Sequence, residues 1–156
     1  MNDWTMPTGQ LMAGKRGLIM GVANDKSIAW GIARQLHLQG AELAFTYQGD
    51  ALEKRVRPLA ESIGSQVLLP CDVTSDADLD AVFDALGTRW GGIDFLVHSI
   101  AFSDKNELKG SFVENTTREN FARTMDISAY SLVACAKRAM GLMPPGGSII
   151  TLTYLR

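Results

Sequence analysis

The chain has 156 residues, enough for one domain with a buried core. Its 46% hydrophobic and 21% charged residues and its net charge of −2 are ordinary for a globular protein, and its scattered lysines and arginines exclude a basic face for nucleic acid. No apolar run reaches the roughly 20 residues needed to cross a bilayer, and two distant cysteines indicate neither a disulfide framework nor a metal site.

Short apolar runs alternate along the chain with segments of helical spacing. In chain order we expect a strand over 16–22, a helix over 28–40, a strand over 42–47, a helix over 51–64, a strand over 66–73, a helix from 74 or 75 to 89, a strand over 93–101, a helix from 116 or 117 to about 142 and a strand over 148–154. This alternation predicts an α/β, doubly wound Rossmann-type fold, with a parallel sheet in the strand order 3-2-1-4-5.

Several residues mark the expected helix ends and interruptions. Pro58 lies inside an expected helix and predicts a kink or a break there. Thr74 or Ser75 can accept a hydrogen bond from the first turn of the next helix. Thr116 and Glu119 have the spacing of a capping box at the start of the last expected helix.

The turn after the first strand reads GVANDKSIAWG, from Gly21 to Gly31. In a doubly wound sheet this turn lies beside the crevice that binds nucleotides. Gly21 would allow close backbone approach, Ser27 would cap the next helix with its hydroxyl near an anionic oxygen, and Gly31 would allow close helix–strand packing. The usual G-x-G-x-x-G pattern is absent, so an ordinary turn with a serine cap is the alternative.

Gly21, Ser27, Ile28 and Gly31 form the pattern G-x5-S-I-x2-G, which resembles the variant glycine motif of bacterial enoyl-acyl-carrier-protein reductases. These enzymes are a divergent branch of the short-chain dehydrogenase/reductase superfamily. The resemblance continues through AELAFTYQGD, LLPCDVT, DFLVHSIAF, MDISAYS and SIITLTY. It implies that NADH reduces a trans-2-enoyl-acyl-carrier-protein to the acyl form in fatty-acid elongation. A ketone- or alcohol-specific dehydrogenase would instead show a T-G-x3-G-x-G turn.

The ends of the second and third expected strands carry the candidate adenosine contacts. Strand two of a Rossmann fold usually ends at an acidic residue that binds the ribose, and Asp50 fits that position, whereas the resemblance implies Gln48. No Lys or Arg stands at 47–50 to neutralise a 2′-phosphate, which favours NADH over NADPH. The resemblance also implies that Asp72 accepts from the adenine amino group while Val73 packs on the ring. A helix cap is the alternative for Asp72.

Other candidates follow the fourth expected strand. The resemblance implies that Ile100 contacts the cofactor and that Ser103 lines the acyl site. Ser128 stands where much of the superfamily has a helix-borne asparagine. His98 lies within the strand, and nothing in the sequence gives it a partner, so we interpret it as structural rather than as a catalytic base.

Tyr154 ends the fifth expected strand, and ligands bind at the carboxyl ends of strands in open α/β sheets. The resemblance implies a catalytic role, in which two tyrosines and a lysine stabilise an enolate and Tyr154 matches the first tyrosine. The other two would follow Arg156. We therefore expect residues 1–156 to be a dinucleotide-binding (Rossmann) domain that lacks the C-terminal part completing the sheet and the substrate site. The alternative for Tyr154 is an ordinary aromatic residue at a strand end. The alternative for the whole chain is a truncated, non-catalytic nucleotide-binding remnant without reductase activity.

The expected partner is an enoyl thioester carried on acyl carrier protein, with no nucleic acid, membrane or metal. The resemblance implies a homo-oligomer, and the apolar strand at 148–154 predicts self-association. Residues 1–13 lack the apolar segment of a signal peptide, so we expect a cytoplasmic protein with reduced thiols.

Overall fold

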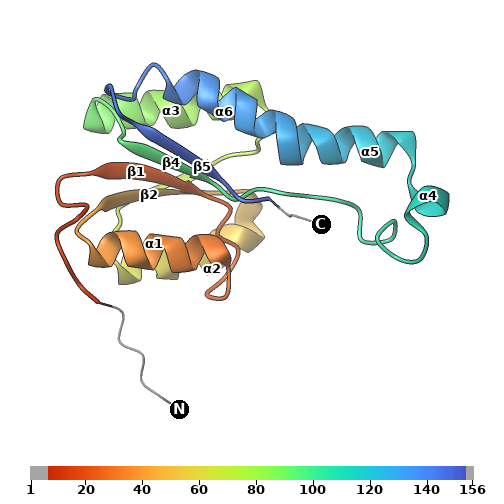
Figure 1. Cartoon of the computed structure of the whole chain (residues 1–156), viewed down its shortest axis with the longest axis horizontal. Coiled ribbons are helices and arrows are strands. Elements are labelled where there is room, and N and C mark those ends of the chain that lie inside the picture. Colours follow the sequence, from red (N-terminus) through yellow and green to blue (C-terminus); the bar gives the residue numbers. More distant parts are fainter. Residues whose placement is uncertain (1–6, 154–156) are drawn as a thin grey trace, which may run out of the picture.

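The computed structural model describes residues 7–153 and contains a five-stranded parallel sheet with helices on both faces (Figure 1). The strands are β1 (Arg16–Met20), β2 (Glu42–Tyr47), β3 (Val67–Pro70), β4 (Phe95–His98) and β5 (Ser148–Thr151). The helices are α1 (Ile28–Leu38), α2 (Gly49–Ser62), α3 (Asp76–Trp90), α4 (Phe112–Asn115), α5 (Arg118–Met125), the π-helical turn η1 (Asp126–Tyr130) and α6 (Ser131–Ala139). The order β3-β2-β1-β4-β5 confirms the predicted topology.

Two apolar layers hold the helices to the sheet, because successive strand residues point to opposite faces. Leu18 and Met20 of β1 pack in the layer beneath α3 and α6. Ile19, between them, joins Phe45 and Val97 in the layer that faces α1 and α2. No helix within residues 7–153 is long and apolar enough to cross a membrane.

The first three helices begin and end near the predicted positions, whereas the single helix expected from 116 or 117 to about 142 is observed as α5, η1 and α6, and α4 was not expected. The α2 helix differs in one further respect. This helix continues through Pro58, so the predicted break is wrong, and the alternative of a kink stays a prediction. Pro58 is exposed, while Val56 and Ala60 of the same helix are buried, and this anchoring outweighs one lost backbone hydrogen bond. Of the two cap candidates for α3, Ser75 is the cap, accepting from the Asp78 amide at 3.2 Å.

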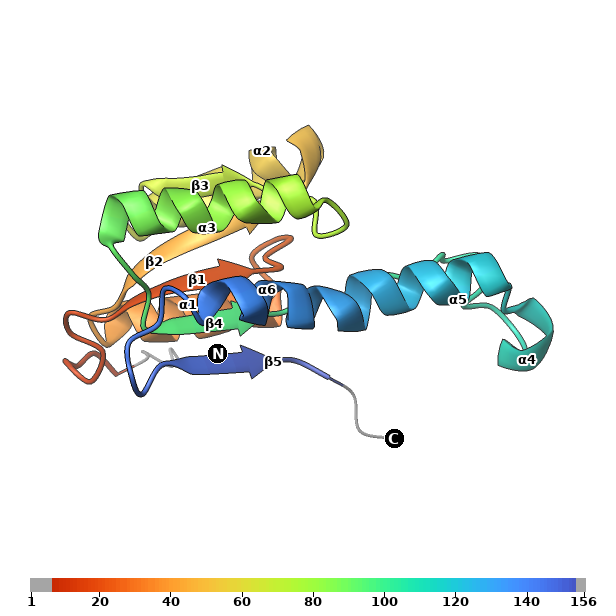
Figure 2. The ribbon, with the colours of Figure 1, turned by 90° about the horizontal axis from the view of Figure 1, so that it is seen from above.

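The predicted capping box at the start of α5 does not form. Thr117 is the N-cap, and its hydroxyl accepts from the Asn120 amide at 3.1 Å. The hydroxyl of Thr116 instead donates to the Phe112 carbonyl at 2.6 Å and closes α4. Glu119 therefore stands one position too early to complete a box with the residue that caps the helix. Figure 2 shows that α5 extends beyond the sheet.

Candidate functional site

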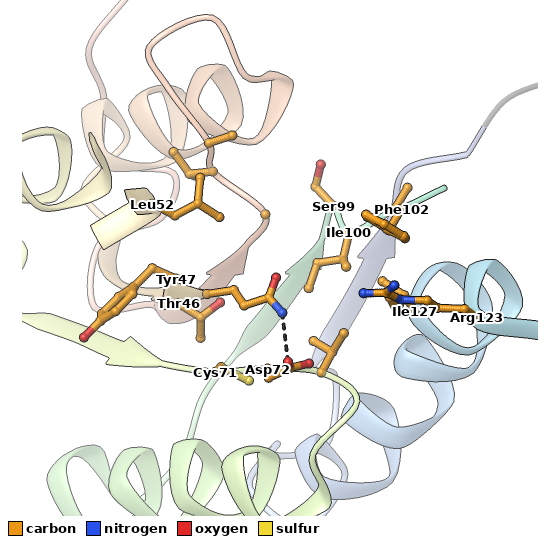
Figure 3. Close-up of a pocket in the computed structure, with 16 residues that line it drawn as sticks. Thr46, Tyr47, Leu52, Cys71, Asp72, Ser99, Ile100, Phe102, Arg123 and Ile127 are labelled. Atoms are coloured by element: carbon orange, nitrogen blue, oxygen red, sulfur yellow. Dashed lines mark hydrogen bonds between the residues drawn. The ribbon is translucent and has the colours of Figure 1, made fainter. Parts of the chain in front are cut away.

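A cavity of about 320 Å³ opens at the carboxyl ends of β1, β2, β3 and β4 (Figure 3). Arg123 of α5 and Ile127 of η1 close it on the helical side. Several predicted cofactor residues line the cavity together: Gly21, Gln48, Asp72, Val73 and Ile100. The cavity lies where parallel strands end beside the reversal of strand order, which is the usual ligand position in this fold.

Gly21 follows β1, and both its backbone conformation and the close approach of another segment require glycine at this position. Its φ of +98° is in the region that favours glycine. A Cβ at this position would lie 1.8 Å from the carbonyl oxygen of Ser99. Within the chain, the neighbour that requires glycine here is therefore the segment after β4, and the expected approach of a nucleotide to this turn stays a prediction.

The rest of the glycine motif differs from expectation. Ser27 occupies the N-cap position of α1 but makes no side-chain cap. Its hydroxyl oxygen instead accepts from the amides of Ala23 and Asn24, at 3.0 and 3.1 Å, because the loop folds back onto it. Ile28 is 70% exposed and, like Ser27, does not line the cavity. The predicted close packing of Gly31 is wrong, since an added Cβ would meet no atom of residues 7–153 within 4 Å outside its own helix turn.

Gln48 and Asp72 meet across the ends of β2 and β3. The Gln48 amide donates to Asp72 Oδ2 at 2.8 Å, and the backbone amide and hydroxyl of Thr74 donate to Oδ1 at 2.9 and 2.7 Å. Burial raises the pKa of Asp72, but these hydrogen bonds and the charge of Arg123 bring it below its usual value. Asp72 is thus an ionised acceptor that closes a turn instead of capping α3. Asp50 lies in the first turn of α2, outside the cavity.

The other cavity walls are largely apolar. Val73 and Ile100 pack against the core layer beneath them and leave one side facing the cavity. Cys71 also lines it, and burial raises the pKa of this thiol to about 12, so it stays protonated at neutral pH. This environment suits a planar apolar ring whose polar edge reaches Asp72.

The π-helical turn carries the helical wall of the cavity. Ser128 fixes it to the loop after β4, because its hydroxyl accepts from the Phe102 amide at 3.0 Å and donates to the Phe102 carbonyl at 3.2 Å. Its donor and acceptor are thus both used by backbone. The turn also places Ile127 in the cavity lining. Isolated π turns inside α-helices often occur at functional sites.

His98 joins three elements in the interior and does not line the cavity. Its Nε2 lies 2.8 Å from the hydroxyl of Ser131 and its Nδ1 lies 3.1 Å from that of Thr151. Ser131 donates its only hydroxyl proton to the Ile127 carbonyl at 2.6 Å, so Nε2 must be the donor to Ser131 and Nδ1 the acceptor from Thr151. Burial lowers the pKa of His98, which favours this neutral form. These contacts agree with a structural role.

Ser103 lies outside the cavity lining. Its hydroxyl oxygen accepts from the Asn120 amide at 3.2 Å and lies 3.3 Å from the Thr124 hydroxyl, so α5 holds it. Its assignment to the acyl site stays a prediction. Tyr154 falls outside the described residues. Within residues 7–153, no group of three His, Cys, Asp or Glu side chains is arranged to hold a metal ion.

Sequence reasoning missed Arg123, which lines the cavity and lies over the ring of Phe102, 4.7 Å from its centroid. No motif marks it, since it reaches the site from a helix distant in sequence from the strand ends. It also missed the role of Ile127, although that residue lies within the quoted stretch MDISAYS. Helical spacing could have found Arg123, because it stands four residues before Ile127 and so lies on the same helix face one turn earlier.

Residues 21–156 match the family described as Enoyl-(Acyl carrier protein) reductase. The chain belongs to this family. Among curated relatives, the enoyl-acyl-carrier-protein reductase (NADH) 2 of Rhizobium meliloti strain 1021 is 64% identical over 144 residues, covering 92% of this chain and 53% of the relative. The chain thus spans about half the length of the curated relatives it matches.

Solved structures of enoyl-acyl-carrier-protein reductases share the fold. The Anaplasma phagocytophilum reductase, described in complex with NAD, is 53% identical with a TM-score of 0.90 over 96% of this chain and 57% of its own. The Bacillus cereus reductase, described with NADP+ and an indole naphthyridinone, is 49% identical with a TM-score of 0.89 over 94% of this chain and 57% of its own. Relatives of similar fold have therefore been solved with either dinucleotide.

Proposed function

We propose that this chain binds NADH in the cavity at the carboxyl edge of its sheet and serves an enoyl-acyl-carrier-protein reductase reaction. The reaction would be the NADH-dependent reduction of a trans-2-enoyl thioester, carried on acyl carrier protein, during fatty-acid elongation. The observation that carries the proposal is the meeting of Gly21, Gln48, Asp72 and Ile100 in one cavity of a chain that belongs to this family.

The cavity residues fit a dinucleotide. Gly21 lines the cavity in the turn after β1, where a pyrophosphate would lie, and its close contact with the Ser99 carbonyl holds that turn beside the end of β4. Asp72, kept ionised by its hydrogen bonds, can accept from an adenine amino group. Val73 and Ile100 supply the apolar surface for the ring. When bound, NADH would supply the hydride for the β-carbon of the enoyl thioester.

The catalytic role of Tyr154 belongs to the same proposal. β5 is parallel to β4, so the chain after Thr151 leaves the sheet at the same edge as the cavity. A phenol there could donate a hydrogen bond to the thioester oxygen as negative charge develops on it. Ser103 is proposed to contact the acyl chain, on the strength of the family resemblance alone.

A fluorescence titration tests binding, and the two candidate carboxylates provide a matched pair. Asp72→Asn should weaken NADH binding about tenfold, because the variant loses a charged acceptor. Asp50→Asn, which changes an exposed carboxylate outside the cavity, should bind as the unaltered chain does. NADPH should bind more weakly than NADH, since no cation stands at 47–50 for its extra phosphate. Equal or tighter NADPH binding would contradict this preference.

The reaction is tested separately, by NADH absorbance in the presence of a crotonyl thioester. NADH consumption that depends on the thioester supports the reductase proposal. NADH binding without consumption supports a nucleotide-binding protein without reductase activity. Absence of NADH binding would overturn the proposal for the cavity itself.

We also propose that the chain self-associates and works in the cytoplasm. β5 is the outermost strand on its side within residues 7–153, and Ile149 and Ile150 on it are 37% and 48% exposed. Burial of these side chains against another copy would remove apolar surface from water. The free thiols of Cys71 and Cys135 suit a reducing compartment. Sedimentation showing a monomer at micromolar concentration would contradict self-association.

A further inference from the structure

Arg123 is an exposed arginine whose guanidinium is held in place by an aromatic ring. Its guanidinium carbon lies 4.7 Å from the centroid of Phe102. Among residues 7–153, no hydrogen bond or ion pair of this guanidinium is found. The backbone of Phe102 is held in place, because its amide and its carbonyl both hydrogen-bond to the hydroxyl of Ser128. The guanidinium of Arg123 is thus held in position while its N–H groups are not used by other residues within 7–153.

The charge of Arg123 acts on the cavity. Arg123 and Asp72 are the two charged side chains among the residues that line it. The positive charge of Arg123 contributes to lowering the pKa of Asp72. Figure 3 shows the guanidinium end of Arg123 beside Phe102, directed toward Ile100 and the side of the cavity where Asp72 lies. The group therefore faces the part of the cavity that would hold the base of a nucleotide.

The position of Arg123 favours a contact with the base of a nucleotide over a contact with its phosphates. The turn expected to meet a pyrophosphate follows β1, around Gly21. Arg123 enters the cavity from the other side, beside Phe102 and Ile127. A guanidinium is planar and stacks on aromatic rings. When one of its two faces lies against a ring of the protein, the other face can stack on a second ring.

We propose that Arg123 covers the adenine of the bound nucleotide by stacking, with Phe102 as the positioning residue behind it. This inference rests on the proposed binding of NADH. The base would then lie between the apolar surface of Ile100 and Val73 and the plane of the guanidinium, with its amino edge toward Asp72. Arg123 is thereby a contact for the adenine half of the cofactor.

Three variants of the full chain, titrated with NADH by fluorescence, test the stacking. Arg123→Met should bind NADH about three- to thirtyfold more weakly, the range expected for a cation on an aromatic face. Arg123→Lys keeps the charge but loses the planar group, so it should recover little of the loss. Phe102→Leu should weaken binding less than Arg123→Met does. Combined with Arg123→Met, it should add little, because both act through one contact.

Arg118→Met is the matched control, since Arg118 lies on the same helix, is exposed and does not line the cavity. It should bind NADH as the unaltered chain does. Unchanged binding by Arg123→Met would overturn the inference while leaving the proposed function intact. Full recovery by Arg123→Lys would also overturn it, and would assign Arg123 to a phosphate. Failure of the unaltered chain to bind NADH would overturn both proposals.

Discussion

Replacing Ser131 by alanine tests the hydroxyl bridge that joins His98 to α6. The change removes the oxygen that accepts from His98 Nε2 at 2.8 Å and donates to the Ile127 carbonyl at 2.6 Å. Ser131 is 0% and His98 1% exposed, so water has poor access to replace the lost partner. Ser131→Ala therefore leaves a buried N–H donor without an acceptor.

The expected loss of unfolding free energy is about 2 kcal/mol, since a buried unsatisfied polar group costs roughly 1–3 kcal/mol. For a chain of this size that corresponds to a fall in melting temperature of about 4–8 °C. Urea unfolding at pH 7 measures the loss, provided that the dependence on urea is unchanged.

Ser62→Ala is the matched control, because the Ser62 hydroxyl also donates to a carbonyl, that of Leu59 at 2.7 Å, but at an exposed helix end. It should change stability by no more than about 0.5 kcal/mol. Equal small losses in Ser131→Ala and Ser62→Ala would refute the argument that burial makes the His98 bridge important.

The same bridge predicts how stability depends on pH. Burial lowers the pKa of His98 from its ordinary 6.5. Just below pH 6.5 the unfolded chain therefore binds more protons, and stability should be full above that pH and fall as the pH drops below it. Asp72, Asp94 and Glu107 have lowered pKa values and titrate at more acidic pH. In urea unfolding, the His98→Gln variant should lose less unfolding free energy than the unaltered chain as the pH drops below 6.5. The control His37→Gln, at an exposed site, should lose stability with falling pH as the unaltered chain does. If His98→Gln also lost stability to the same extent, the pH dependence would have to come from other groups.

Three further substitutions and one chemical modification have definite expected outcomes. In thermal unfolding, Gly21→Ala should destabilise the chain by more than about 1 kcal/mol, because its φ is +98° and its Cβ would lie 1.8 Å from the Ser99 carbonyl oxygen. Gly31→Ala, in open space on α1, should instead stabilise it by up to about 1 kcal/mol, and equal effects would contradict both assignments. Thr117→Ala should cost about 1 kcal/mol and speed hydrogen exchange in α5, whereas unchanged exchange would show that the cap contributes little. Alkylation of Cys71 at pH 8 should be much slower in the folded chain than in urea, because burial raises its pKa to about 12, and rapid labelling of the folded chain would exclude this.

Much of the fold could be predicted from local patterns. Alternating apolar runs and helical segments specify parallel strands, and the preference for right-handed crossovers leaves few strand orders. The fate of Pro58 could not be predicted, because it depends on how firmly Val56 and Ala60 pack against the sheet. The cap of α5 required knowing that Thr116 is already engaged with the preceding turn.

The site could be predicted where it lies at strand ends. Asp72 is found this way, since the ends of neighbouring parallel strands must come together, whereas the strand-end pattern alone favoured Asp50 and only the family resemblance pointed to Gln48. The role of the Ser27 hydroxyl could not be predicted from the sequence, because amides of the loop and amides of the helix compete for the same oxygen. Arg123 and the π turn depend on contacts between distant segments, such as that of Ser128 with Phe102, which leave no local periodicity.

The π-helical turn has a consequence for which insertions and deletions this family can accept. Each helical residue rotates the following chain by about 100°, so the wider turn at 126–130 offsets α6 from an uninterrupted continuation of α5. With this offset, Arg123 and Ile127 face the cavity while Ala134 and Cys135 face the core. Deleting one residue here would restore a regular helix but turn one of these two faces away. A relative shortened at this point would keep either the cavity at the sheet edge or its core packing, unless a second length change nearby restored the offset.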